Sequence, residues 1–578
     1  MSENNSFKGA SFRISSRSEI GARLGKALLD AGLIDAAKLD ELRHRSAWID
    51  QSLEKVIRRE SVISEKQMLE CLSRITGVPT VNMARIEIDK SVIDSVSART
   101  ATKFEIMPLK ISQGTITLLT DRVWETSDED QLRVILGYSV EWLLATTQEI
   151  RECIKHYYGV GVETLLEIRE MEKDGALAST REDDESSANI TSFVNEIIRD
   201  AIRIDATDIH IEPRETGLRL RYRIDGVLQT FPLPEGIETY SRAVISSVKV
   251  MAQMNIAEHR KPQDGRFSIT LDQETFDIRV SVLPMQFGET LNLRILNREA
   301  TFIDIEQLGL SDDNRSVLEE MISLPYGMIL FTGPTGSGKT TSLYAALVHL
   351  NDDKRKVVTL EDPIEYRIED ITQMQMDPRA GLTFANGLRS VLRHDPDIVL
   401  VGEIRDAETA DIAVSAALTG HLVFSTLHTN DSIGALTRLL DMNVEPYLVA
   451  SALEGAVAQR LMRLICPQCK QEHELDDRLL ADLAASLPGT EANPAVYRGR
   501  GCPNCRFTGY RGREPIFEIM RMDDELRALT TRHSTASELM DCAIGKKGLE
   551  TLRQRGWRKV LQGTTTVEEL LRVTRMES

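Results

Sequence analysis

The sequence predicts an α/β protein of several domains, with a parallel β-sheet in its C-terminal half. Unbroken apolar runs, typical of strands buried on both faces, alternate with helical segments between residues 301 and about 450. The segment GPTGSGKTT (residues 333–341) follows one such run and precedes a helical pattern. A glycine-rich loop between a buried strand and a helix is the context that a phosphate-binding loop requires.

Length and charge limit the class of protein. The chain has 578 residues, 42% hydrophobic and 28% charged, and a formal charge of −19. This length suffices for three or four domains, and the acidic balance argues against a general nucleic-acid binder. No run approaches the ~18 apolar residues of a membrane span, and the polar N-terminus does not resemble a secretory signal. We therefore expect a cytoplasmic chain that meets a membrane only through a partner.

Composition and periodicity divide the chain into five segments. We expect a disordered tail over residues 1–17, a mixed α and β region over 18–160, and a charged, serine-rich linker over 161–188. Residues 189–300 have the helix and strand patterns of an α+β domain. Residues 301–578 contain the parallel-sheet pattern, followed by two cysteine pairs and short helical segments.

The phosphate-binding loop fits the pattern GxxxxGK[ST]. Its glycines allow successive backbone N–H groups to face the phosphates. Lys339 is expected to reach the β- and γ-phosphates, and the hydroxyl of Thr340 to hold Mg²⁺. The residues expected to contact a nucleotide are Gly333, Pro334, Thr335, Gly336, Ser337, Gly338, Lys339, Thr340 and Thr341.

Carboxylates end two of the apolar runs. Glu361 and Asp362 close VVTLED, and Glu403 closes DIVLVGE. In open α/β sheets, ligands bind beyond the carboxyl ends of the strands, so these side chains are expected near the loop. We assign Glu361 as the general base and Glu403 as the carboxylate on the Mg²⁺ side, although the sequence also allows the reverse assignment.

Two histidines flank the strand pattern in TGHLVFSTLHTND. They are His421 and His428, seven residues apart. A lone histidine in such a place is more often a hydrogen-bonded structural residue than a chemical one. His428 follows the strand and is the candidate for contacting a γ-phosphate or a neighbouring subunit; we do not expect it to act as a base.

The 189–300 domain is rich in arginine. Alternation in LRLRYRID places Arg219, Arg221 and Arg223 on one face of a strand. Further arginines of this domain are Arg260, Arg266, Arg279 and Arg294. The set forms either a solvated basic face or a source of arginine fingers that neutralise transition-state charge on phosphates, and the sequence does not choose between the two.

Four of the seven cysteines form two CxxC pairs separated by 32 residues: Cys466 with Cys469, and Cys502 with Cys505. Four thiolates in a cytoplasmic protein suit a tetrahedral structural Zn²⁺ site, with an iron–sulfur cluster as the alternative metal group. A disulfide pair is disfavoured in that compartment. The remaining Cys71, Cys153 and Cys542 are scattered and expected to be inert.

Several motifs together resemble the secretion ATPase superfamily. They include ITSFVNEIIRDAIRIDATDIHIEP, RYRIDGVL, IAEHRKPQDGRF, GPTGSGKTT, TLEDPIEY, LRHDPDIVLVGEIRDAETA, ALTGHLVFSTLHTNDS, AQRLMRLICPQC and GCPNCRFTGYRGR. The resemblance covers residues 189–578. It is strongest to type II secretion assembly ATPases and to type IV pilus extension ATPases, and the cysteine pairs distinguish the chain from pilus retraction ATPases.

This resemblance implies a fold and a set of site residues. It implies a RecA-like P-loop ATPase domain with a tetracysteine zinc insert over 464–512, preceded by a PAS-like α+β domain and a smaller N-terminal α+β region. It implies an acidic motif at Glu361, Asp362 and Glu365, a Walker B motif ending at Glu403, and a histidine motif at His421 and His428. The arginines implied to approach ATP are Arg221, Arg266, Arg279 and Arg294.

The resemblance also implies a function. Such ATPases form hexameric rings, bind ATP, Mg²⁺ and Zn²⁺, and drive an inner-membrane platform protein that adds subunits to a pseudopilus. The chain is then expected in the cytoplasm, held at the inner membrane by the platform protein and by the cytoplasmic part of a bitopic membrane protein. The alternative within the superfamily is a type IV pilus extension ATPase.

The N-terminal region carries a partial resemblance of its own. RLGKALLDAGLIDAAKL resembles the first half of a cyclic di-GMP-binding domain. That half lacks its terminal glutamine, with Ser46 in its place, and QSLEKVIRRESVIS does not repeat the RLG triplet. We therefore expect residues 18–160 to dock a membrane partner and do not expect them to bind cyclic di-GMP.

Two other classes of function use a similar nucleotide fold. A nucleic-acid translocase is disfavoured because the chain is acidic and has no basic stripe. A regulatory nucleotide-binding module without turnover is disfavoured because the carboxylates and arginines needed for phosphoryl transfer are all present.

Overall fold

The structure is a computed structural model that describes residues 17–574 except 50, 82, 84, 85, 87, 174–181, 298–303, 353 and 492. Most of the expected N-terminal tail lies outside the described residues, and Arg17 already begins a helix. The chain forms two compact units. The first contains residues 1–296 and 500–509, and the second contains residues 297–499 and 510–578.

The first unit begins with a helical part and a small sheet. The helices are α1 (Arg17–Asp30), α2 (Ala36–Trp48), α3 (Leu53–Arg59), α4 (Glu65–Thr76), α5 (Lys90–Ile93), α6 (Ala98–Phe104), α7 (Thr126–Leu136) and α8 (Thr147–Tyr158). Strands β1 (Met107–Ser112), β2 (Thr115–Thr120) and β3 (Ser139–Leu144) form a sheet in that order. Strand β1 runs antiparallel to β2, and β3 runs parallel to β2. This part has the mixed α and β character expected of residues 18–160.

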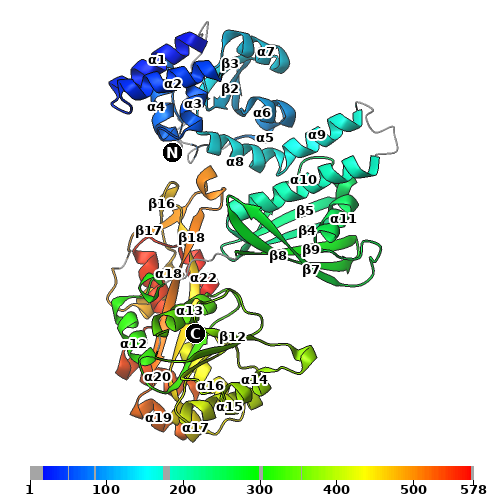
Figure 1. Cartoon of the computed structure of the whole chain (residues 1–578). Coiled ribbons are helices and arrows are strands. Elements are labelled where there is room, and N and C mark those ends of the chain that lie inside the picture. The colour runs from blue at the N-terminus through cyan, green and yellow to red at the C-terminus, as the bar shows by residue number, and fades with distance from the viewer. Residues whose placement is uncertain are drawn as a thin grey trace. The chain divides into compact units, whose positions relative to one another are not determined.

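A six-stranded sheet forms the second part of this unit (Figure 1). Its strands are β4 (Ala206–Arg214), β5 (Gly217–Ile224), β6 (Val227–Phe231), β7 (Gln263–Leu271), β8 (Glu274–Met285) and β9 (Gly288–Asn297), in the order β6-β5-β4-β9-β8-β7. Helices α10 (Glu182–Arg203) and α11 (Ser241–Met251) contribute to the same core as the apolar face of this sheet. The opposite face is polar, because side chains alternate along each strand.

The expected linker over 161–188 is only partly correct. Helix α9 (Val162–Lys173) occupies its first half, and α10 begins at Glu182. Leu165 and Ile168 of α9 are buried in the core of the six-stranded sheet. The prediction missed α9 because its apolar residues, although at helical spacing, directly precede the charged segment of residues 171–188. Residues 174–181 lie outside the described residues.

The second unit contains the predicted parallel sheet. Its strands, in spatial order, are β12 (Thr372–Gln375), β11 (Val357–Glu361), β13 (Ile398–Val401), β14 (Leu422–Leu427), β10 (Gly327–Thr332), β15 (Leu453–Ile465) and β18 (Tyr510–Arg521). The first six are parallel, and β18 pairs antiparallel with β15. The parallel-sheet prediction is confirmed.

Helices cover both faces of this sheet. They are α12 (Asp312–Ile322), α13 (Lys339–Leu350), α14 (Phe384–Val391), α15 (Ala407–Leu418), α16 (Ser432–Asp441), α17 (Pro446–Ala452), α19 (Asp524–Thr531), α20 (Ala536–Lys547), α21 (Leu552–Leu561) and α22 (Val567–Val573). Every residue of β10, β13 and β14 is buried, which explains their unbroken apolar runs. An insert adds β16 (Lys470–His473), α18 (Asp477–Ser486) and β17 (Val496–Gly499).

The strand order determines where functional side chains gather. Because β10, β11, β13 and β14 are parallel, their carboxyl ends lie at one edge of the sheet. Residues that follow these ends include Gly333, Glu403 and His428, and Glu361 is the last residue of β11. The fold thus brings together residues that lie far apart in the sequence.

Candidate active site

The loop between β10 and α13 requires glycine at two positions. Gly338 caps α13 with φ +90°, and a Cβ there would lie 2.7 Å from Nε2 of Gln459. Gly333 has φ +149°, and a Cβ there would lie 2.7 Å from the backbone oxygen of Gln459. The neighbouring strand β15 therefore packs directly against this loop. Only glycine combines these backbone angles with such close approach.

Lys339 is folded back onto its own loop. Its Nζ donates hydrogen bonds to the carbonyl oxygens of Gly333, at 2.7 Å, and Pro334, at 3.0 Å. Ser337 is 3% exposed, and its Oγ has no hydrogen-bond partner among the described residues. A buried hydroxyl without a partner beside a buried ammonium group suits a site that receives an oxyanion.

The charge of Lys339 is sensitive to its surroundings. Burial lowers the pKa of Lys339 to about 8, the nearby charge of Arg460 acts in the same direction, and the carboxylate of Glu403 opposes both effects. Lys339 is therefore close enough to Glu403 for their charges to interact. A phosphate group bound at the loop would restore the usual preference of Lys339 for its charged form.

Glu403 follows β13 at this edge and, unlike Glu361, is partly accessible. Its side chain is 15% exposed and forms an ion pair with Arg405 at 2.5 Å. His428 lies nearby, with its Nε2 3.6 Å from Oε2 of Glu403. The predicted proximity of Lys339, Glu403 and His428 agrees with this geometry. His428 is half-exposed, so its side chain is accessible to a ligand.

Glu361 has a different environment from the one expected. It is 4% exposed, and its Oε1 accepts hydrogen bonds from Thr359 at 2.5 Å and Gln373 at 3.2 Å. The Tyr344 hydroxyl donates to Oε2. Both oxygens of the expected general base are thus occupied inside the domain. In this conformation, neither oxygen is free to accept a proton from a water molecule at the site.

His421 lies at the opposite edge of the sheet. It precedes β14, and its backbone oxygen accepts a hydrogen bond from the N–H of Gly327 at the start of β10. Its Nδ1 lies 2.9 Å from the backbone oxygen of Ala416. The length of β14 separates it from His428 by about 20 Å. His421 therefore has a structural environment, and the two histidines do not form one site.

The sequence did not identify three residues that help to form this site: Gln459, Arg460 and Tyr344. Gln459 accepts a hydrogen bond from Ser342 at 2.9 Å. The buried Arg460 donates to the backbone oxygen of Asn430 at 2.7 Å. Tyr344 on α13 holds Glu361. The first two lie on β15, far along the chain from the loop. No local pattern shows that β15 pairs with β10, and this pairing brings them to the site.

The arginines of the first unit share the polar face of the six-stranded sheet, but their partners differ. Arg219 and Arg221 both form ion pairs with Glu212, and Arg223 and Arg294 both form ion pairs with Asp208. The prediction that Arg219, Arg221 and Arg223 share one strand face is confirmed by their alternation on β5.

Arg266 and Arg279 are arranged differently. They are directly opposite each other on β7 and β8, both are exposed, and neither has an ion-pair partner among the described residues. Like charges opposite each other across strands are destabilising. This pair of guanidinium groups is therefore the part of the basic face best suited to receive an anion.

The four cysteines of the CxxC pairs lie together. Their sulfur atoms all lie within 4.8 Å of one another, and all four residues are buried. Burial raises the pKa of Cys153 to about 12 and also raises that of Cys71, which agrees with an inert role for these two thiols. Four converging thiols form the donor set of a closed tetrahedral metal site.

Comparison with known families identifies the chain. The sequence model of the family described as Type II/IV secretion system protein matches residues 183–572. The chain belongs to this family. It is accordingly an ATPase. A second model, the MshEN domain, matches residues 76–164 of the N-terminal region.

Curated relatives support this assignment. The type II secretion system protein E of Pseudomonas aeruginosa is 48% identical over 393 residues, which cover 68% of this chain and 77% of that protein. The type IV pilus assembly ATPase PilB of Myxococcus xanthus is 38% identical, covering 96% of this chain and 99% of that protein. The type II secretion system protein E of Xanthomonas campestris is also 38% identical, covering 96% and 98% respectively.

Among the described residues, no helix of the ATPase combines the length and the apolar character needed to cross a bilayer.

The pKa of Lys339 predicts a pH effect on nucleotide binding. The charged form binds phosphate, so affinity should be full below pH 8 and fall as pH rises through that value. We expect the Kd for a non-hydrolysable ATP analogue with Mg²⁺ to rise about tenfold between pH 7 and pH 9, measured by calorimetry. The Lys339→Arg variant stays charged over this range, so its weaker binding should not change with pH. A wild-type Kd that is constant over this range would contradict the assignment.

Proposed function

We propose that this chain hydrolyses ATP to power protein export through a type II secretion system. The observation that carries the proposal is the site itself: a glycine-rich loop, Lys339 and the accessible Glu403 share one sheet edge in a chain whose family match spans residues 183–572. Proteins named type II secretion system protein E are 47–48% identical to it over about two thirds of its length. Two relatives named for pilus assembly are 38% and 39% identical over 96% and 90% of the chain. Type II secretion is favoured because the relatives of higher identity carry that name.

The chain's own residues account for phosphoryl transfer to water. Backbone N–H groups of the loop, Ser337 and Lys339 hold the β- and γ-phosphates of ATP. Thr340 and Glu403 would hold Mg²⁺, whose charge offsets the charge that develops between the β- and γ-phosphates. Glu361 can accept a proton from the attacking water only in a conformation in which Tyr344 releases Oε2. The products are ADP and inorganic phosphate.

Arg266 and Arg279, which have no ion-pair partner among the described residues, are the best candidates for arginine fingers. Of the four arginines that the resemblance implies, Arg221 and Arg294 are already neutralised by Glu212 and Asp208. Arg266 and Arg279 repel each other in the absence of an anion, so binding of a phosphate would remove an unfavourable interaction. We assign them to transition-state stabilisation when ATP is bound.

The four cysteines would hold one Zn²⁺ that stabilises the insert. The donor set fits because four buried thiols converge, and four sulfur ligands leave no open position for chemistry. The ion would therefore act in folding of this segment and not in catalysis.

Assembly and location follow from the family resemblance. The chain would act as a homohexamer in the cytoplasm, at the inner membrane, in contact with a platform protein and with the cytoplasmic part of a bitopic membrane protein. The formal charge of −19 supports protein partners and argues against nucleic acid. The N-terminal region has only the first half of the cyclic di-GMP-binding pattern, so we do not assign that ligand to it.

A genetic experiment tests the proposed function. In the bacterium that encodes this chain, deletion should block export of a type II substrate, and the wild-type chain should restore it. The Lys339→Ala chain should fold and reach the same level but restore neither export nor ATPase activity, because the phosphates lose their ammonium contact. Loss of pili with intact export would show that the pilus role is correct instead.

Charge neutralisation by the arginine pair is tested by kinetics. We expect Arg279→Gln and Arg266→Gln each to lower kcat about 100-fold or more, with a smaller change in KM for ATP. Arg219→Gln is the matched control, since that arginine lies on the same face but is engaged by Glu212. Equal losses in all three variants would refute the assignment of the pair.

The metal site is tested by metal content. We expect about one zinc ion per purified chain, lost in Cys466→Ser together with a lower unfolding temperature. Cys542→Ser replaces a buried cysteine outside the cluster and should retain zinc. Iron with sulfide in place of zinc, or a metal-free chain of equal stability, would refute the zinc site.

A further inference from the structure

A cavity of about 790 Å³ lies in the N-terminal part of the first unit, and none of its lining residues belongs to the loop or to the arginine set discussed above. Residues of α1, α3 and α8, the end of α6 and the turn that follows β2 line it. This volume is within the range of sites that bind small ligands or inserted side chains. The proposed ATPase mechanism makes no use of it.

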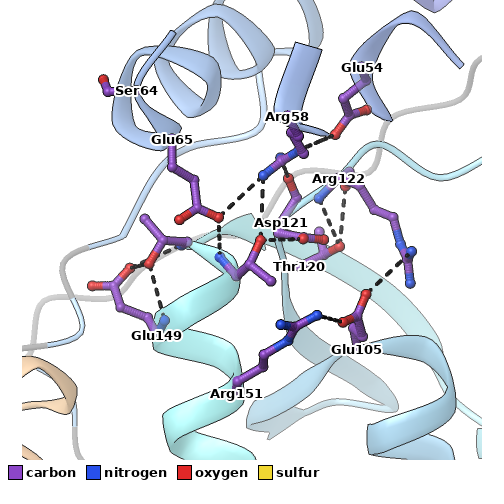
Figure 2. Close-up of polar contacts among 12 residues, drawn as sticks. Glu54, Arg58, Ser64, Glu65, Glu105, Thr120, Asp121, Arg122, Glu149 and Arg151 are labelled. Carbon is purple, nitrogen blue, oxygen red and sulfur yellow. Dashed lines mark hydrogen bonds and ion pairs between the residues drawn. The ribbon is translucent and has the colours of Figure 1, made fainter. Parts of the chain in front are cut away.

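Arg58 is the centre of the polar network on one side of this cavity. Figure 2 shows its guanidinium group between Glu54, Glu65 and the backbone of Asp121. Its nitrogens lie 3.2 Å from Oε1 of Glu54 and 3.3 Å from Oε1 of Glu65, and they also donate to the backbone oxygen of Asp121. The hydroxyl of Thr147 donates to Oδ2 of Asp121 at 2.7 Å.

This network leaves one carboxylate oxygen without a hydrogen-bond donor. The carboxylates of Glu54 and Glu65 both contact the guanidinium of Arg58, whereas the carboxylate of Asp121 accepts from Thr147 and only its backbone oxygen accepts from Arg58. Asp121 lines the cavity and is 6% exposed, and its Oδ1 has no hydrogen-bond partner among the described residues. An unpartnered buried carboxylate oxygen is costly unless a donor reaches it.

The negative charge of Glu54 is also incompletely compensated by its surroundings. It is 8% exposed, and burial raises its pKa to about 7, with Asp121 adding to this effect and Arg58 and Arg122 opposing it. A second cation at this position would allow both carboxylates to be charged without mutual repulsion.

The other walls of the cavity are apolar next to Asp121 and charged elsewhere. Leu53, Phe104, Val123 and Trp124 provide apolar lining. Arg122 and Arg151 both form ion pairs with Glu105, at 3.7 Å and 2.8 Å. The exposed side chains of Lys55, Arg59 and Asp128 also line the cavity. Apolar walls leading to buried carboxylates suit a long side chain with a cationic end.

We propose that this cavity binds a basic side chain, an ammonium or guanidinium group, presented by a segment of a partner protein. The cation would donate to Oδ1 of Asp121 and lie beside Glu54, while its methylene stem packs against the apolar lining. The proposal does not depend on ATP hydrolysis, so its failure would leave the proposed function intact.

The proposal is tested on the full chain with two amino-acid amides of nearly equal shape. Nα-acetyl-arginine amide should show saturation transfer from the protein in NMR, and a titration should give its Kd. The neutral isostere Nα-acetyl-citrulline amide should bind at least about tenfold more weakly, since it lacks the charge that the carboxylates attract. Asp121→Asn should weaken binding of the arginine amide by a similar factor.

Controls separate binding from folding. The side-chain amide in the Asp121→Asn variant keeps an oxygen for Thr147 while removing the charge, and thermal unfolding checks that the fold is retained. Glu54→Gln is the second variant if Asp121→Asn fails to fold. Asp128→Asn alters an exposed carboxylate on the same cavity and should leave Kd nearly unchanged. The proposal would be overturned if the two amides bound equally well or if the arginine amide received no saturation transfer from the protein. It would also be overturned if neither Asp121→Asn nor Glu54→Gln changed the Kd of the arginine amide.

Discussion

The contact between the phosphate-binding loop and strand β15 is the constraint on which the nucleotide site depends. The loop can turn from β10 into α13 only because Gly333 and Gly338 leave room for Gln459. Parallel pairing of β10 with both β14 and β15 fixes that contact and also brings the end of β14, with His428, to the same edge. The position of every polar group around Lys339 follows from this strand order.

Electrostatics at this edge explain the position of the Lys339 side chain. Arg460 is buried and donates hydrogen bonds to backbone oxygens, and its charge acts on Lys339. The ammonium group of Lys339 is stabilised against this repulsion by hydrogen bonds to the carbonyl oxygens of its own loop. The site thus concentrates positive charge where phosphates would bind, which is the preorganised arrangement that phosphoryl transfer requires.

Much of this arrangement could be predicted from the sequence, because short spans define the apolar strands, the loop and the acidic strand ends. The environment of Glu361 could not be predicted, since its donors Tyr344 and Gln373 come from elements that meet it only after folding. Helix α9 was missed because its apolar residues adjoin a charged segment. The arginines look equivalent along their strands, and only the cross-strand register reveals that Arg266 faces Arg279.

The central claim is that Lys339 exchanges the carbonyls of its loop for the phosphates of ATP. A structure of the full chain with Mg²⁺ and ADP–beryllium fluoride tests this most directly. The account predicts that Nζ of Lys339 leaves Gly333 and Pro334 and contacts the β-phosphate and the fluoride group. A structure in which Lys339 keeps both carbonyl contacts while the nucleotide is bound would contradict it.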